Sequence, residues 1–218
     1  DIYRPYKEKK KTKASEAIKN GLEPLAKMIM SFPTTGTLED MAKKFITEAV
    51  PTTDAALEGA GYIIAEWISD NASYRKWIRF NTFQNATISS KVKKNAEDEN
   101  KLYEMYYEFT DKVKYIKHYR VLALNRGEKE KILNVKIVVN DDRLIAFLNQ
   151  RFIEYPLSKA NEYIKEAIAD GYKRLILPSL EREIRAELTA KGEEQAIEIF
   201  SINLQKLLLQ PPMRGMVV

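Results

Sequence analysis

Cysteine is absent from the sequence, histidine occurs once, and glycine and proline occur only eight times each in 218 residues. Without cysteine, the chain can form no disulfide framework, cysteine-ligated zinc site or thiol nucleophile. The scarcity of glycine and proline disfavours a sandwich or barrel built on many tight turns. No uninterrupted run of about 18 apolar residues, as a membrane-spanning helix needs, is present. The first residues are polar and basic rather than a signal peptide. We therefore expect a cytoplasmic protein without a membrane partner.

Residues typical of enzyme sites are also scarce. A catalytic triad, an imidazole acid–base pair or a histidine-based metal site would depend on His118 alone. The sequence contains no G-x-x-x-x-G-K-[ST], G-x-G-x-x-G or G-x-S-x-G motif, so no phosphate-binding loop or nucleophile elbow is indicated. Asp141 and Asp142 precede a predicted helix and are better explained as its cap than as magnesium ligands. We expect no catalytic residues, no metal, no cofactor and no enzymatic activity.

The residues that are abundant favour helices. Apolar residues make up 44% and charged residues 31% of the chain, and most of its common residue types are helix formers. One apolar stripe repeats at the helical spacing of three and four residues, and it comprises Leu57, Ala60, Ile64, Trp67 and Ile68. The fold class that we predict is all-α and multihelical, with helix-turn-helix-like elements and at most one minor β pairing.

One convincing strand interrupts this helical pattern. Residues 132–139 alternate between the two faces of a strand and are rich in β-branched side chains. A single strand needs a partner, and residues 215–218 are the candidate of similar character. Residues 85–94 are predicted to be extended or a short strand, and residues 103–109 a short helix. Gly127 is expected to end a helix over residues 116–126, and Pro178 to interrupt the long helices near the end of the chain.

The predicted organisation has three segments. Residues 1–94 form a helical, helix-turn-helix-like region that includes a basic and aromatic stretch. Residues 95–140 contain connecting helices and the strand, and residues 141–218 contain long helices. The net charge of +5 is unevenly distributed, because residues 31–70 hold two bases and seven acids whereas residues 71–94 hold six bases and no acid. Such asymmetry bears on partners more than on fold.

The basic stretch is the best indication of function. Its six bases are near Trp77, Phe80 and Phe83, and bases interleaved with aromatic residues are typical of nucleic-acid binding. The predicted contact residues are Arg75, Lys76, Arg79, Lys91, Lys93 and Lys94. The alternative is that Tyr74, Trp77 and Ile78 are core residues and that the bases form a solvated face.

Several motifs, spread in order along the chain, resemble the bacterial Tex transcription accessory proteins. They are D-I-Y-R-P-Y at residues 1–6, G-L-E-P-L-A at 21–26, A-G-Y-I-I-A-E-W-I-S at 60–69, H-Y-R-V-L-A-L-N-R-G-E-K-E at 118–130, E-E-Q-A-I at 193–197 and L-L-L-Q-P-P at 207–212. In that family the chain continues beyond the last motif into an RNase-H-like domain. Helix-hairpin-helix and OB-fold RNA-binding domains follow it.

The resemblance implies a helical fragment of a transcription accessory, nucleic-acid-binding protein. On this reading the chain is a scaffold segment without catalysis of its own. Its expected partners are RNA or DNA and proteins of the transcription machinery. The alternative is a protein–protein interaction module that docks transcription or translation machinery, with the acidic segment 31–70 as its candidate surface.

Overall fold

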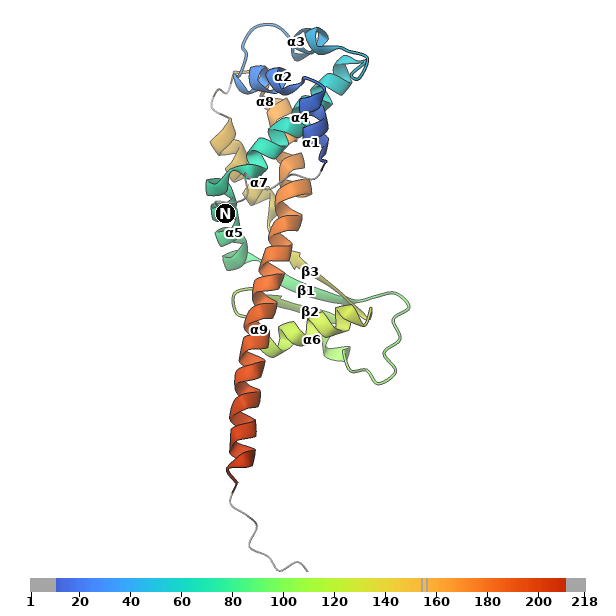
Figure 1. Cartoon of the computed structure of the whole chain (residues 1–218), viewed down its shortest axis with the longest axis vertical. Helices are drawn as coiled ribbons and strands as arrows, with labels where there is room; N and C mark the ends of the chain where they lie inside the picture. Colours follow the sequence, from blue (N-terminus) through green and yellow to red (C-terminus); the bar gives the residue numbers. More distant parts are fainter. Residues whose placement is uncertain (1–10, 154, 156, 211–218) are drawn as a thin grey trace, which may run out of the picture. The chain divides into compact units, whose positions relative to one another are not determined.

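The computed structural model describes residues 11–153, 155 and 157–210, which fall into two compact units. Unit 1 combines residues 11–82 with the described part of 140–180, and unit 2 combines residues 83–139 with 181–210. Each unit therefore draws on more than one of the three segments suggested by the sequence. The elements are α1 (Lys13–Lys19), α2 (Glu23–Met30), α3 (Leu38–Ala42), α4 (Thr53–Asp70), α5 (Ala72–Asn85), β1 (Thr87–Val92), β2 (Glu108–Lys112), α6 (His118–Lys129), β3 (Leu133–Val138), α7 (Asp141–Phe152), α8 (Asn161–Asp170) and α9 (Leu177–Leu208) (Figure 1).

Helix α4 forms the centre of unit 1. Small residues on α4 let neighbouring helices approach closely. A Cβ atom placed on Gly59 would lie 2.3 Å from Cδ1 of Leu22, which precedes α2. One placed on Gly171, directly after α8, would lie 2.9 Å from the carbonyl oxygen of Ala65 on α4. Ala60, Ile64 and Ile68 of the predicted apolar stripe are fully buried, which confirms most of the stripe, although Trp67 is 37% exposed.

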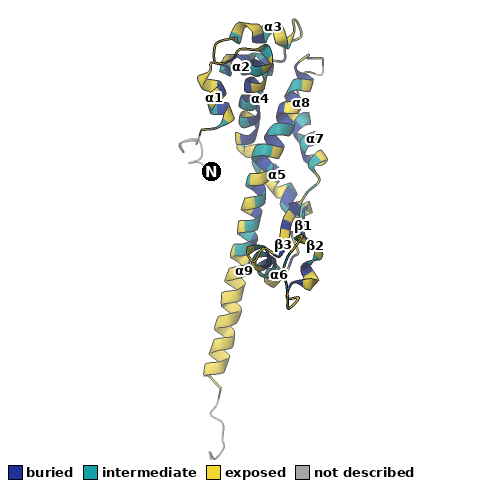
Figure 2. Ribbon diagram, turned by 90° about the vertical axis from the view of Figure 1, so that its right-hand side faces the viewer, coloured by how far each residue is buried: buried dark blue, intermediate teal, exposed yellow. Residues whose placement is uncertain are grey.

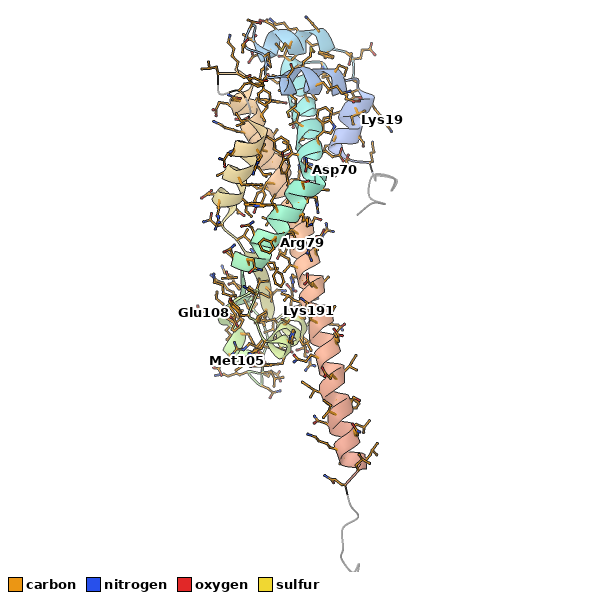
Figure 3. The ribbon with its side chains drawn as sticks, turned by 90° about the vertical axis from the view of Figure 1, so that its left-hand side faces the viewer. Lys19, Asp70, Arg79, Met105, Glu108 and Lys191 are labelled. Carbon is orange, nitrogen blue, oxygen red and sulfur yellow. The ribbon has the colours of Figure 1, made fainter. Side chains whose placement is uncertain are left out.

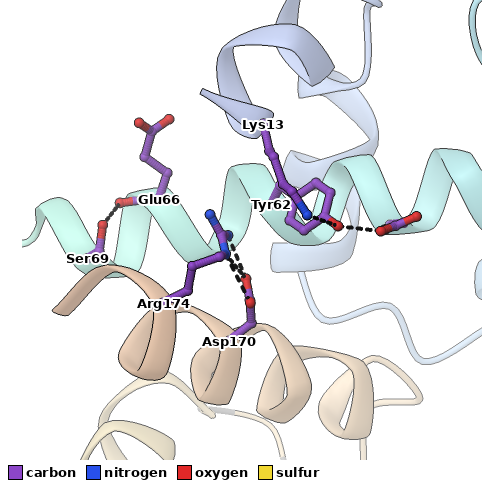
Figure 4. Close-up of polar contacts among 7 residues, drawn as sticks. Lys13, Tyr62, Glu66, Ser69, Asp170 and Arg174 are labelled. Atoms are coloured by element: carbon purple, nitrogen blue, oxygen red, sulfur yellow. Dashed lines mark hydrogen bonds and ion pairs between the residues drawn. The ribbon is translucent and has the colours of Figure 1, made fainter. Parts of the chain in front are cut away.

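A polar layer joins α4 to its neighbours where the apolar contacts end. Lys13 of α1 donates a hydrogen bond of 2.9 Å to the hydroxyl of Tyr62, and the guanidinium of Arg174 lies 5.1 Å from the same ring (Figure 4). Arg174 also forms a two-nitrogen contact with the carboxylate of Asp170, with its shortest distance at 2.6 Å. These contacts hold α1 and the segment after α8 against one side of α4.

Pro178 does not interrupt the helix, contrary to the prediction. The chain runs from α8 through a π-helical segment, Gly171–Ile176, directly into α9, where Pro178 is the second residue. A π-turn changes the hydrogen-bond ladder locally, so that the missing N–H of proline is accommodated. Within this segment Tyr172 is fully buried, and its hydroxyl donates a hydrogen bond of 2.7 Å to Asp141 at the start of α7.

Unit 2 is built on a three-stranded antiparallel sheet with the order β2-β1-β3. This corrects the prediction of at most one β pairing, because β1 pairs with both neighbours. The predicted strand 132–139 is confirmed as β3, but its partner is β1; residues 215–218 lie outside the described residues. Residues 103–109 are not a helix throughout, because a short 3₁₀ turn, Glu104–Tyr106, leads into β2. The protein is thus mostly helical with a small sheet.

Helix α6 packs on one face of this sheet. Gly127 lies inside α6 rather than at its end. The helix approaches β3 so closely there that a Cβ atom on Gly127 would be 2.6 Å from Cδ1 of the buried Leu133. Helix α9 protects the free edge of β3. Glu181 accepts a hydrogen bond of 3.3 Å from the backbone N–H of Ile137, and Arg185 pairs with Glu128 while donating to the carbonyl of Val135. Two edge groups of β3, the N–H of Ile137 and the carbonyl of Val135, therefore have side-chain partners.

The helix-turn-helix-like arrangement stays a prediction. Helices α4 and α5 follow one another with only Asn71 between them, whereas the turn of that motif usually has about three or four residues. The amide oxygen of Asn71 instead accepts hydrogen bonds from the backbone N–H groups of Ser73 and Tyr74, at 3.1 and 3.2 Å. It thereby caps the first turn of α5.

Candidate nucleic-acid interface

Three of the six predicted contact residues lie on α5 in unit 1, and one of them has a structural role. Arg75 is partly buried, and its guanidinium donates to the carbonyl oxygen of Ser69 at 3.3 Å and to the hydroxyl of Ser179 at 2.8 Å. It thereby ties the end of α4 to the start of α9. Lys76 and Arg79 are exposed, and Phe80 is 62% exposed; Figure 3 labels Arg79 on α5.

The other aromatic residues of α5 in unit 1 are used for packing within that unit. The ring of Trp77 stacks on Phe147 of α7 with a centroid distance of 3.4 Å, and Tyr74 meets Phe152 edge-on at 4.9 Å. Ile78 is fully buried. The core alternative is therefore confirmed for Ile78 and accounts for the packing of Tyr74 and Trp77. A continuous basic and aromatic surface over residues 71–94 does not form within one unit.

The remaining three predicted residues lie in unit 2, at and after the end of β1. Lys91 is the exposed fifth residue of β1, and Lys93 and Lys94 follow the strand. The backbone N–H of Lys93 donates to the carbonyl of Ile132 at 2.8 Å, so the chain remains against the start of β3. The six predicted residues are thus divided between the two units, three in each.

The strand register places Lys91 on a face of the sheet that α6 does not cover. Lys91 is opposite Glu108 of β2 and Asn134 of β3, Ser89 is opposite Thr110 and Lys136, and Thr87 is opposite Lys112 and Val138. Directly opposed residues in antiparallel strands point to the same face. We call this surface the open sheet face; its members are Thr87, Ser89, Lys91, Glu108, Thr110, Lys112, Asn134, Lys136 and Val138.

The open sheet face combines positive charge with small polar side chains. It holds three lysines and one acid, Glu108, and all four of these residues are exposed. The hydroxyl groups of Thr87, Ser89 and Thr110 lie among them. Long ammonium side chains and hydroxyls are groups that bind phosphate oxygens without reading base sequence. Lys112 and Lys136 were not among the predicted contact residues, because their membership depends on which strands pair.

The largest pKa changes belong to two tyrosines of unit 1, the half-buried Tyr163 and the buried Tyr172, and have a structural explanation. Burial is the main cause of the raised pKa of both Tyr163 and Tyr172. Tyr163 donates a hydrogen bond to the carbonyl of Leu57, and Tyr172 donates to Asp141, so both hydroxyls join helices in their protonated form. In unit 2, burial alone would raise the pKa of Asp98. The pKa is nevertheless lowered, because the carboxylate accepts hydrogen bonds from Leu102, Tyr103 and Tyr107, which together outweigh the effect of burial.

Two other features are absent from the part of the chain that the structure describes. No group of three or more histidine, aspartate or glutamate side chains there could hold a metal ion. No helix in the described part of the chain is long and apolar enough to cross a membrane.

The mostly helical fold with a small antiparallel sheet defines the general class. A family model described as Tex central region-like matches residues 34–200, and the chain therefore belongs to the Tex family.

Known proteins similar to this chain come from distant organisms. The uncharacterized protein YdcI of Bacillus subtilis is 51% identical over all of the chain, and the transcriptional accessory protein Tex of Neisseria gonorrhoeae is 28% identical over 97% of it. The human S1 RNA-binding domain-containing protein 1 is 31% identical over 97% of the chain. The chain spans 31%, 28% and 22% of the length of these relatives, respectively.

Proposed function

We propose that the chain is a helical scaffold segment of a Tex-like transcription accessory protein, without catalysis of its own, that contributes secondary contacts to RNA or DNA in the cytoplasm. The observation that carries the nucleic-acid contact is the open sheet face of unit 2. Membership of the Tex family supports the transcription role. The name of the human relative, which refers to RNA binding, supports the choice of nucleic acid as a partner of the longer protein.

The open sheet face fits a phosphate backbone better than a base-specific site. Its exposed lysines, Lys91, Lys112 and Lys136, come one from each strand, so the positive charge spreads across the whole width of the sheet. Lys94 extends the charge beyond the end of β1. The described face has no aromatic side chain on which a base could stack, and an array of this kind binds through counterion release. The contact should therefore be weak, insensitive to sequence and sensitive to salt.

The test is a salt titration of the full chain with a fluorescent single-stranded RNA and a fluorescent DNA duplex. We expect the variant K91A/K112A/K136A to bind more weakly than the unmodified chain at low salt. Each phosphate contact that is lost should lower the magnitude of the slope of log K against log[salt] by about 0.7 to 0.9. Fluorescence anisotropy measures both quantities.

A matched control removes the same charge from exposed positions of unit 1. The variant K19A/K44A/K173A should retain most of the affinity, because its lysines lie outside the open sheet face. Equal losses in the two variants would show that net charge alone governs binding. Such a result, or no binding by the unmodified chain at low salt, would remove the open sheet face from the proposal.

A specific observation also favours protein–protein interaction as a second candidate function. Beyond Gly192, every described residue of α9 is exposed (Figure 2). One side of this part carries Ile197, Phe200, Leu204 and Leu208, which are 42–73% exposed and follow the helical spacing. Glu193, Glu194 and Glu198 accompany them, so a partner with an apolar groove and a basic rim fits this side better than nucleic acid does. The acidic segment 31–70 stays a predicted surface.

Purified bacterial RNA polymerase and ribosomes are suitable probes for this second function. Co-sedimentation with one of them should be reduced at least about tenfold by F200S/L204S, since buried aromatic and aliphatic anchors dominate interface energies. The control L102S/M105S changes two side chains of unit 2 that are 70% and 72% exposed outside α9. If both variants bind as the unmodified chain does, this side of α9 is not the docking surface.

A further inference from the structure

Unit 2 contains a surface cleft of about 560 Å³ beside the beginning of α6. One wall is the segment 113–119, which leads from the end of β2 into the first turn of α6. The other wall is Phe83 together with one side of α9, where Leu188, Lys191 and Ile199 face the cleft. None of these residues belongs to the open sheet face, so the cleft is a separate feature of the same unit.

The charged side chains of the cleft are all basic. Lys114, Lys117 and Lys191 line it, and no acid is among the described lining residues. Lys191 also forms an ion pair of 2.7 Å with Glu187, on its own helix, so it is the most neutralised of the three (Figure 3). The Nζ atom of Lys114 lies 5.2 Å from the centre of the Tyr115 ring. The cleft therefore favours an anion.

The beginning of α6 adds to this preference. Lys117 is the N-cap residue and provides no side-chain hydrogen bond to the first turn, and the first turn contains no acid. The backbone N–H groups of a helix start carry partial positive charge and bind phosphate well. In addition, the Nδ1 atom of His118 is buried and has no hydrogen-bond partner among the described residues. His118 is the first residue of this turn and lines the cleft.

Aromatic rings are present where a base could rest. Tyr115 is 67% exposed and Tyr119 is 63% exposed, and both line the cleft. Their exposed rings can stack on any nucleobase. Phe83 lies on the opposite wall, with Nζ of Lys191 5.4 Å from its ring centre. An inorganic anion would use the lysines and the helix start but leave these rings unoccupied.

We propose that this cleft binds a nucleoside monophosphate group, with the phosphate at Lys117 and the first turn of α6 and the base against Tyr115 or Tyr119. The ligand is either a free nucleotide or one nucleotide of a single strand, since both present the same chemistry. The proposal goes beyond the contacts of the open sheet face, because it assigns a discrete site that recognises a base as well as a phosphate.

His118 provides a direct reporter, because it is the single histidine of the chain. Its imidazole signals can be followed by NMR in the full chain prepared without a histidine tag, at constant pH and ionic strength. Titration with AMP, with UMP and with a hexanucleotide should move these signals in a saturable manner. Inorganic phosphate at the same concentrations should act at least about tenfold more weakly, because it lacks the stacking contribution.

Two variants and two controls complete the test. Y115A/Y119A, which removes both exposed rings, should weaken the AMP response about tenfold or more and leave the phosphate response unchanged, whereas K117A should weaken both. K129A/K131A, near the other end of α6, should change neither. K91A/K112A/K136A should also retain the AMP response, so a failure of the open sheet face does not count against the cleft.

The same titrations distinguish a free nucleotide from a nucleotide within a strand. A response to the hexanucleotide with none to AMP or UMP places the nucleotide within a strand, and a response to all three supports a nucleotide in either form. Equal responses to AMP and inorganic phosphate would overturn the proposal, since the base would then contribute nothing. His118 signals that do not move with any ligand at millimolar concentration would overturn it as well.

Discussion

Replacement of Tyr172 by alanine is expected to lower the free energy of unfolding of unit 1 by about 3–5 kcal/mol, the usual cost of truncating a buried aromatic side chain. Tyr172 is fully buried in the π-helical segment, and its hydroxyl donates to Asp141. The substitution therefore removes apolar packing and leaves a carboxylate without its donor. Both tryptophans of the chain, Trp67 and Trp77, lie in unit 1. Urea unfolding followed by tryptophan fluorescence thus reports on this unit.

Tyr172→Phe separates the two contributions. It keeps the ring and removes only the hydroxyl, so we expect a loss of about 1 kcal/mol, as for a single hydrogen bond. This variant also keeps the measurement possible if the alanine variant is unfolded without urea. If the alanine variant is as stable as the phenylalanine variant, the ring of Tyr172 is not part of the core.

In unit 2, Leu133→Ala is expected to cost about 2–5 kcal/mol. Leu133 is fully buried at the start of β3, directly against Gly127 of α6. Gly127 has no side chain that could move into the cavity left by the substitution. No tryptophan lies in unit 2, so unfolding in urea is measured from the NMR signals of His118.

Val138→Ala is the matched control for this prediction. Val138 lies on the same strand but on the open sheet face, where it is 51% exposed. Its truncation should change the free energy of unfolding by no more than about 0.5 kcal/mol. If the two variants are equally stable, the inward and outward faces of β3 are not as the register places them.

Local periodicity was enough to predict much of the helical framework and one strand. The spacing of Ala60, Ile64 and Ile68 indicates the buried side of α4, and the alternation in residues 132–139 indicates β3, because each pattern is contained in a short stretch of chain. β2 was missed for the opposite reason. Its residues, Glu108–Lys112, are mostly polar or charged and have little intrinsic strand preference. Pairing with β1 is what makes them a strand.

The candidate interface shows the same limit. Lys91 was predicted from its basic surroundings, but Lys112 and Lys136 join it only through strand pairing across 21 and 45 residues. Arg75 had the same sequence signal as Lys91. Its hydrogen bond to Ser179, 104 residues away, gives it a structural role that no local pattern contains. Composition therefore indicates that bases are grouped, but tertiary pairing decides which of them face outward together.

The position of Glu181 and Arg185 beside β3 has a consequence for self-association. An open strand edge is a template on which another chain can add a strand, and this is a common route to aggregation. Here the two α9 side chains occupy hydrogen-bonding groups of the β3 edge, and the opposite edge, β2, is short and carries Glu108, Asp111 and Lys112. Strand addition is thereby disfavoured at both edges, so the exposed polar face of the sheet does not bring with it an open edge for fibril growth.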